Sequence, residues 1–131
     1  MIPAELVASG KFPFLQASLI VKKKEVGSIF LHVGERDVCI ILLNNKETDK
    51  IKHVGKELLN YAHRISEKMG KKGHLSTFAT QNAHSFFYLM GFRAMNDKTN
   101  AVIEEEIKTA HQSKRKADTT KLRGTLMRNQ K

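Results

Sequence analysis

The chain is poor in cysteine, proline and tryptophan: its 131 residues include one cysteine, two prolines and no tryptophan. A single thiol excludes an internal disulfide. Cys39 lies inside the apolar run VCIILL, where a thiol usually acts as a small buried hydrophobic group. A lone reduced cysteine is typical of a reducing compartment, so we expect a cytoplasmic protein.

Long apolar runs are also absent. No run approaches the roughly 20 residues that a membrane-spanning helix needs. The N-terminal segment MIPAELVASGKFPF has neither a basic leader nor a long apolar stretch, so we expect no secretory signal. These features predict a protein without a membrane partner.

The six histidines do not form a recognisable metal motif. They are His32, His53, His63, His74, His84 and His111, and no pair has a ligand spacing with a partnering cysteine or carboxylate. We therefore predict no metal site.

Acidic residues are scarce, since 13 Asp and Glu oppose 23 Lys and Arg and leave a net charge of +10. Much of the excess lies between Lys108 and Lys131, where eight basic residues face one acid, Asp118. Such a tail can bind nucleic acid or an acidic partner by charge neutralisation. The alternative, which we favour because the tail lacks interleaved aromatic residues, is a solvated and poorly ordered terminus.

Hydrophobic periodicity predicts alternating strands and helices. Alternating apolar residues predict strands, and apolar residues at three- and four-residue spacing predict helices. The predicted strands are 17–23, 27–33, 38–43, 74–79 and 92–95, and the predicted helices are 4–8, 54–69, 82–90 and 101–110, with a turn at 96–100. Because 38–43 is apolar at every position, we expect it to be buried on both faces. The order indicates an α/β or α+β fold with a parallel crossover.

The start of the helix at 54–69 is a candidate anion site. The first amides of a helix have no partner within it, and the helix dipole favours negative charge there. Gly55 would let a phosphate approach the backbone, and Lys50, Lys52 and Lys56 add positive charge. The alternative is a helix start with one glycine and solvated lysines.

Two segments together resemble the GNAT superfamily of N-acetyltransferases. KIKHVGKELLNYA is similar to the coenzyme A motif Arg/Gln-x-x-Gly-x-Gly/Ala, with Lys50, His53 and Gly55 at its three positions. ATQNAHSFFYLMGF resembles a second signature of Asn, Ala, Phe-Tyr and Gly-Phe. Thr80, Ala83, Phe86-Phe87 and Gly91-Phe92 stand at its positions, and the resemblance covers about residues 28–92.

The resemblance implies a mixed, mostly antiparallel sheet with a central, splayed parallel pair of strands, 38–43 and 74–79, and flanking helices. It also implies acetyl-CoA as co-substrate and an amine as acceptor, without a metal or a covalent enzyme intermediate. The implied cofactor-binding residues are Leu42, Leu43, Lys50, Lys52, His53, Val54, Gly55, Lys56, Thr80, Ala83 and Phe87.

Catalytic residues are harder to assign, because Phe87 replaces the tyrosine that protonates the departing thiolate in many members of the superfamily. Tyr88 is the neighbouring candidate, although one step along a helix turns it by about 100°. Glu35 is the candidate base, with a plain polar turn at Gly34 to Asp37 as the alternative.

We expect residues 1–100 to form one GNAT-like domain with a short N-terminal portion, followed by a C-terminal helix and basic tail at 101–131. A short sheet would leave an open edge that favours a homo-oligomer. The competing function is a catalytically inactive GNAT-like module whose tail binds nucleic acid or an acidic protein.

Overall fold

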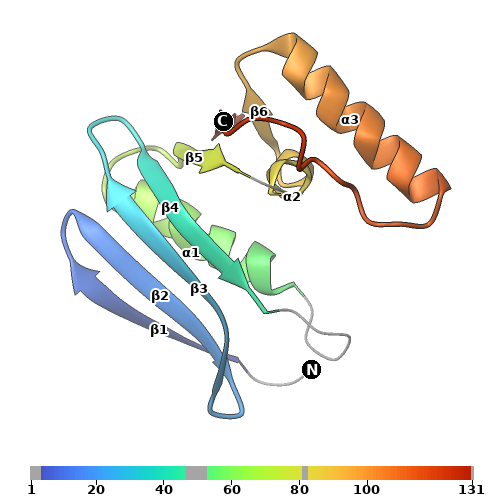
Figure 1. Cartoon of the computed structure of the whole chain (residues 1–131). Helices are drawn as coiled ribbons and strands as arrows, with labels where there is room; N and C mark the ends of the chain where they lie inside the picture. The colour runs from blue at the N-terminus through green and yellow to red at the C-terminus, as the bar shows by residue number, and fades with distance from the viewer. Residues whose placement is uncertain (1–3, 47–52, 81–82, 131) are drawn as a thin grey trace. The chain divides into compact units, whose positions relative to one another are not determined.

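A computed structural model describes residues 4–46, 53–80 and 83–130, and the chain divides into an N-terminal part (residues 1–75) and a C-terminal part (residues 76–131). Each part has its own strands and helices, coloured by position in Figure 1. The elements are β1 Ala4–Lys11, β2 Phe14–Val21, β3 Lys24–Val33, β4 Val38–Asn45, α1 Val54–Lys68, β5 Leu75–Ala79, α2 His84–Leu89, β6 Phe92–Ala94, α3 Asp97–Gln112 and β7 Thr125–Asn129.

In the N-terminal part, β1 to β4 form an antiparallel meander, and α1 packs along one face of it (Figure 1). Side chains alternate between the two faces of a strand, so the strand register assigns each residue to a face. The face toward α1 carries Ala17, Leu19, Ile29, Leu31 and Ile40, all less than 10% exposed. We call this the inner face and the opposite one the outer face.

The helix α1 supplies the other half of this core. Val54, Leu58 and Ala62 recur at four-residue spacing and are at most 1% exposed. Gly27 on β3 allows the close approach, because a Cβ there would lie 2.5 Å from Val54 Cγ1 and 3.0 Å from a Leu58 methyl. The first turns of α1 are therefore fixed against the sheet.

The strand β4 differs from the prediction that it is buried on both faces. Leu31 pairs with Ile40 and Phe30 pairs with Leu42, so Ile41 is an extra residue in β4, which is the register of a bulge. Ile40 is 2% exposed, whereas Ile41 is 55% and Leu42 48% exposed. The prediction was wrong because α1 covers only the inner face and the bulge turns Ile41 outward.

In the C-terminal part, the strand order is β5-β7-β6 and both pairings are antiparallel. β7 lies between the other two, where Met127 pairs with Thr77 on one side and Ala94 on the other. Met127 is fully buried. The expectation of a poorly ordered terminus was wrong here, because Met127 supplies apolar area that the basic composition hides.

The helices of the C-terminal part have well-defined ends and contacts. Asn96 caps α3 by accepting a 2.8 Å hydrogen bond from Lys98 N, which starts the helix earlier than the predicted turn at 96–100 allows. Asn100 then binds both the N–H and the carbonyl of Ala94, each at 2.9 Å. These bonds tie the first turn of α3 to the end of β6.

The N-terminal segment also differs from prediction. We expected a short helix at 4–8, but Ala4–Lys11 is strand β1 and pairs with β2 along its whole length. Gly10 adopts a φ of +98° near the hairpin end, and a Cβ there would lie 2.7 Å from Phe14 O. Pairing with a neighbouring strand thus decides the structure of this segment, which its local pattern cannot show.

The other predicted elements are confirmed to within a few residues. Among the helices that the structure describes, none is long and apolar enough to cross a membrane. The predicted parallel pair takes one strand from each part of the chain. Which residues of the two strands pair stays a prediction, because the positions of the two parts relative to one another are not determined.

Candidate functional site

The start of α1 is the first candidate site. His53, its N-cap, has φ 64° and ψ 23°, a left-handed conformation, and its side chain makes no capping hydrogen bond. Glycine adopts this conformation with the least strain. His53 therefore holds the backbone shape expected of the motif glycine that it replaces, while it adds an imidazole.

The first turn of α1 places small and apolar residues against the sheet. Val54 and Gly55 are buried and Lys56 is exposed. The N–H of Glu57 donates to His53 O at 3.0 Å, which closes the first helical turn. Lys50 and Lys52, two of the predicted cofactor contacts, lie outside the described residues.

The end of β4 carries the other predicted cofactor contacts of the N-terminal part. Leu42 and Leu43 follow the bulge at Ile41, and the strand ends at Asn45. A bulge locally disrupts the ladder of backbone hydrogen bonds and bends the strand. Strand, bulge and helix start thus lie in succession along residues 38–56, as a coenzyme that binds by backbone contacts would require.

Thr80, Ala83 and Phe87 belong to the C-terminal part. The N–H of Ala83 donates to Thr80 O at 3.1 Å, and the N–H of Phe87 donates to Ala83 O at 3.1 Å. The Phe87 ring is 5% exposed and stacks edge-on with Phe92, with centroids 5.2 Å apart. Phe87 is therefore a core residue, and its cofactor contact stays a prediction.

Tyr88 lies in a polar cluster between α2 and α3. Its hydroxyl donates to Glu104 Oε2 at 2.9 Å, and the guanidinium of Arg93 lies 3.6 Å from the centre of its ring. Desolvation first, and then the hydrogen bond to Glu104, raise the pKa of Tyr88. Tyr88 thus keeps its proton at neutral pH, but it must leave Glu104 before it can donate that proton elsewhere.

Glu35 is exposed in the turn between β3 and β4, where its carbonyl accepts a 2.9 Å hydrogen bond from Lys71 Nζ. β4 begins at Val38, after this turn, and the extended strand from Val38 to Ile41 alone spans about 10 Å. A base must lie within hydrogen-bond reach of the proton it removes, or one water away. The position of Glu35 argues against direct proton transfer near the bulge.

The sequence did not single out His84 as a structural residue. It is fully buried at the start of α2, its Nε2 lies 3.0 Å from Arg123 O, and its Nδ1 has no partner. The contact requires the proton on Nε2, because a carbonyl oxygen only accepts. Within the described ranges 4–46, 53–80 and 83–130, no three His, Cys, Asp or Glu residues are placed to hold a metal ion.

The structure thus brings Leu42, Leu43, His53, Val54, Gly55 and Lys56 onto consecutive elements of the N-terminal part. Thr80, Ala83, Phe87 and Tyr88 are on or beside α2 in the C-terminal part. A single site built from both groups is what the resemblance implies, and it stays a prediction. The bulge at Ile41 could not be found from the sequence, because a register shift depends on the partner strand.

Solved acetyltransferases have similar structures. PaiA N-acetyltransferase of Thermoplasma acidophilum, in complex with coenzyme A, is 18% identical with a TM-score of 0.61, and the match covers 91% of this chain and 62% of that one. Nourseothricin acetyltransferase is 13% identical with a TM-score of 0.62, covering 90% of this chain and 65% of that one. A GNAT-family acetyltransferase of Staphylococcus aureus is 12% identical with a TM-score of 0.59, covering 89% and 67%.

At these identities the likeness shows the fold, and the chain has the fold of GNAT acetyltransferases. The predicted fold class is thereby confirmed. No protein-family model matches the chain. No curated protein matches it either. The chain spans less than two thirds of the length of the first two solved structures.

Proposed function

We propose that this protein is an N-acetyltransferase that moves an acetyl group from acetyl-CoA to an amine. The observation that carries the proposal is the start of α1. There a left-handed His53 and a buried Gly55 follow the bulged strand β4, in a chain with the GNAT fold. The structures of two similar acetyltransferases, from Thermoplasma acidophilum and Bacillus subtilis, are complexes with coenzyme A.

The residues of the N-terminal part fit the binding of such a coenzyme. Amides at the start of α1 would hold the pyrophosphate, since helix N-termini favour anions and the His53 side chain does not cap this one. Lys56 is exposed in the first turn and adds a positive charge. Backbone groups of β4 around Leu42 would align the pantetheine arm.

The coenzyme supplies a thioester. The protein has to position the amine and to assist two proton transfers, one from the amine and one to the thiolate. The N–C bond forms as the C–S bond breaks, the amine loses a proton to water or a base, and the thiolate gains one. Tyr88 is the proposed proton donor, because it is protonated at neutral pH. We propose water rather than Glu35 as the first proton acceptor, in view of the distance along β4.

Calorimetric titration of the full chain with acetyl-CoA, up to near-millimolar concentration, tests the cofactor. We expect Lys56→Glu to weaken binding at least about tenfold, because it reverses a charge at the positive end of α1. Lys68→Glu is the matched control, since Lys68 is exposed in the last turn of the same helix. A wild-type titration without binding heat and without a change in melting temperature would contradict the proposal that the protein binds acetyl-CoA.

Turnover is a separate question from binding. Release of free coenzyme A thiol in the presence of a panel of amines measures acetyl transfer directly. Binding without thiol release for any amine would favour the inactive interaction module, for which the Phe87 substitution is the motivating observation. Release that depends on one class of amine would identify the acceptor.

A further inference from the structure

The outer face of the β1–β4 sheet carries its charged residues near its two ends. The strand register places its side chains in cross-strand rows: Lys11, Phe14, His32 and Cys39; then Ser9, Gln16, Phe30 and Leu42; then Val7, Ser18, Ser28 and Asn44. Of these residues only Lys11 carries a full charge, and the next row adds Glu5 beside Ile20 and Glu25. The face therefore does not share the basic character of the molecule.

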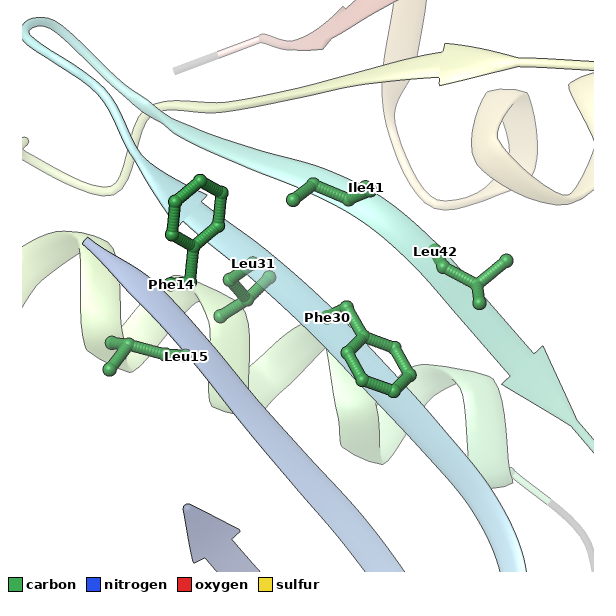
Figure 2. Close-up of a pocket in the computed structure, with 6 residues that line it drawn as sticks. All are labelled: Phe14, Leu15, Phe30, Leu31, Ile41 and Leu42. Carbon is green, nitrogen blue, oxygen red and sulfur yellow. The ribbon is translucent and has the colours of Figure 1, made fainter. Parts of the chain in front are cut away.

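Apolar side chains cluster in the first two of these rows. Phe14 is 58% exposed, Ile41 55% and Leu42 48%. With Phe30 on the same face, and with Leu15 and Leu31, whose side chains belong to the inner face, they line a hollow of about 310 Å³. Figure 2 shows these residues on β2, β3 and β4. Apolar centres with polar surroundings and few charges distinguish the cores of protein interfaces.

We propose that this outer face is a homodimer interface, in which two copies of the chain pack their four-stranded sheets face to face. Two sheets stack in this way at about 10 Å in β-sandwiches, with the side chains of the facing surfaces interdigitating. The partner on each side of such a dimer is the same apolar, nearly neutral face. The outer face is thus complementary to the same face of a second copy.

The size of the face suits a dimer of modest affinity. Three of the strands have eight residues and β3 has ten. Four strands at about 4.8 Å spacing and eight residues at about 3.3 Å give roughly 500 Å² per copy. Two copies reach about 1,000 Å², the lower bound for a specific interface.

Charge favours a second copy over other occupants. A nucleic acid or an acidic protein would gain most from a dense positive surface. The outer face instead has Lys11 near one end and Glu5 near the other, where the Lys46 and Glu25 side chains pair with each other at 3.4 Å. A neutral apolar partner fits this surface best.

Sedimentation equilibrium and labelling of Cys39 test the proposal on the full chain. We expect a mass of twice 14.9 kDa at high concentration. Cys39 is the only thiol of the chain and its register places it on the outer face, beside His32. Its reaction with a maleimide should therefore slow as the protein concentration rises.

Phe14→Lys should raise the dimer dissociation constant at least about tenfold and make labelling independent of concentration. Val102→Lys, at a 51% exposed apolar residue on α3, is the matched control and should change neither. If Phe14→Lys fails to fold, Gln16→Lys places a charge in the adjacent row. A monomer at all concentrations overturns the proposal, and so does a dimer whose Cys39 labelling stays constant, as expected for pairing through the edge strand β1.

Discussion

His53 combines a backbone conformation suited to glycine with a side chain that glycine lacks. Its φ of 64° lies in the left-handed region, which costs an L-residue roughly 1–2 kcal/mol. The imidazole also stands beside the amides that would hold a pyrophosphate. Strain and steric hindrance should therefore both fall when the side chain is removed.

We predict that His53→Gly stabilises the protein by up to about 1 kcal/mol and tightens acetyl-CoA binding several-fold. Urea unfolding and calorimetric titration measure the two effects. Lys72→Gly is the control, because Lys72 also has a positive φ, 59°, but lies beyond the far end of α1. It should gain stability without any gain in affinity, and an equal gain in affinity would contradict the proposed role of His53.

Tyr88 is the residue on which the catalytic proposal depends. We predict that Tyr88→Phe lowers the turnover of acetyl transfer at least about a hundredfold and leaves acetyl-CoA affinity unchanged, because proton donation acts only in the chemical step. Glu104→Gln keeps the phenol but weakens its 2.9 Å hydrogen bond, and it should retain turnover. Equal turnover of Tyr88→Phe and wild type would indicate that water, and not Tyr88, protonates the departing thiolate.

Among the elements, β7 is central to the sheet of the C-terminal part, since it pairs with both β5 and β6. We predict that Met127→Ala lowers the free energy of unfolding by about 2–5 kcal/mol, the usual cost of truncating a fully buried methionine. Leu126→Ala, on the same strand but 40% exposed, should cost much less. Calorimetric or urea unfolding of both variants measures the difference.

The loop after α3 is held by a carboxylate. Arg115 donates to both oxygens of Glu106, at 2.6 and 3.2 Å, and Asp118 N donates to it at 2.7 Å. The hydrogen bonds from Arg115 first, and then from Asp118, hold the pKa of Glu106 below its ordinary value. A lowered pKa contributes stability above the pKa of the unfolded chain, and this contribution is lost as the pH falls.

We therefore predict that stability declines as the pH falls below the ordinary pKa of a glutamate, about 4.3. Glu106→Gln should reduce this decline, because the variant has no proton to bind there. Glu105→Gln, at the adjacent position of α3, is the control and should preserve the wild-type profile. Unfolding free energies measured at each pH decide the matter, and an unchanged profile for Glu106→Gln would refute the role given to this carboxylate.

The elements that the sequence predicted best are those with local signals. The periodicity of α1 predicts its bounds to within a residue, because the signal lies inside the segment. The strand β1 and the burial of Met127 escaped prediction, since both depend on pairing with strands elsewhere in the chain. The bulge at Ile41 escaped for the same reason.

The candidate site was predictable only in part. The two motifs identified the fold, because residue type and spacing are visible in the sequence. That Phe87 packs against Phe92 and that Tyr88 binds Glu104 were not visible, since Glu104 lies sixteen residues further on and meets Tyr88 only through the packing of α2 and α3. Side-chain contacts between elements could not be predicted from these motifs.

At the scale of the whole molecule, dimerisation would link stability to concentration. Because the native dimer is favoured by mass action, we predict that the melting temperature rises with protein concentration. Phe14→Lys should remove this dependence, whereas Val102→Lys should keep it. Scanning calorimetry over a hundredfold range of concentration measures it, and a constant wild-type melting temperature would argue against the dimer.

The central place of β7 also sets an order of events during synthesis. Thr77 and its partner Met127 are fifty residues apart, and β7 follows both β5 and β6 in the chain. β5 and β6 must therefore wait until β7 has been synthesised before their shared neighbour arrives, while β1 to β4 can pair as they emerge. A nascent chain that stalls before β7 would expose two unpaired strand edges, so synthesis through Asn129 is itself a condition for avoiding aggregation.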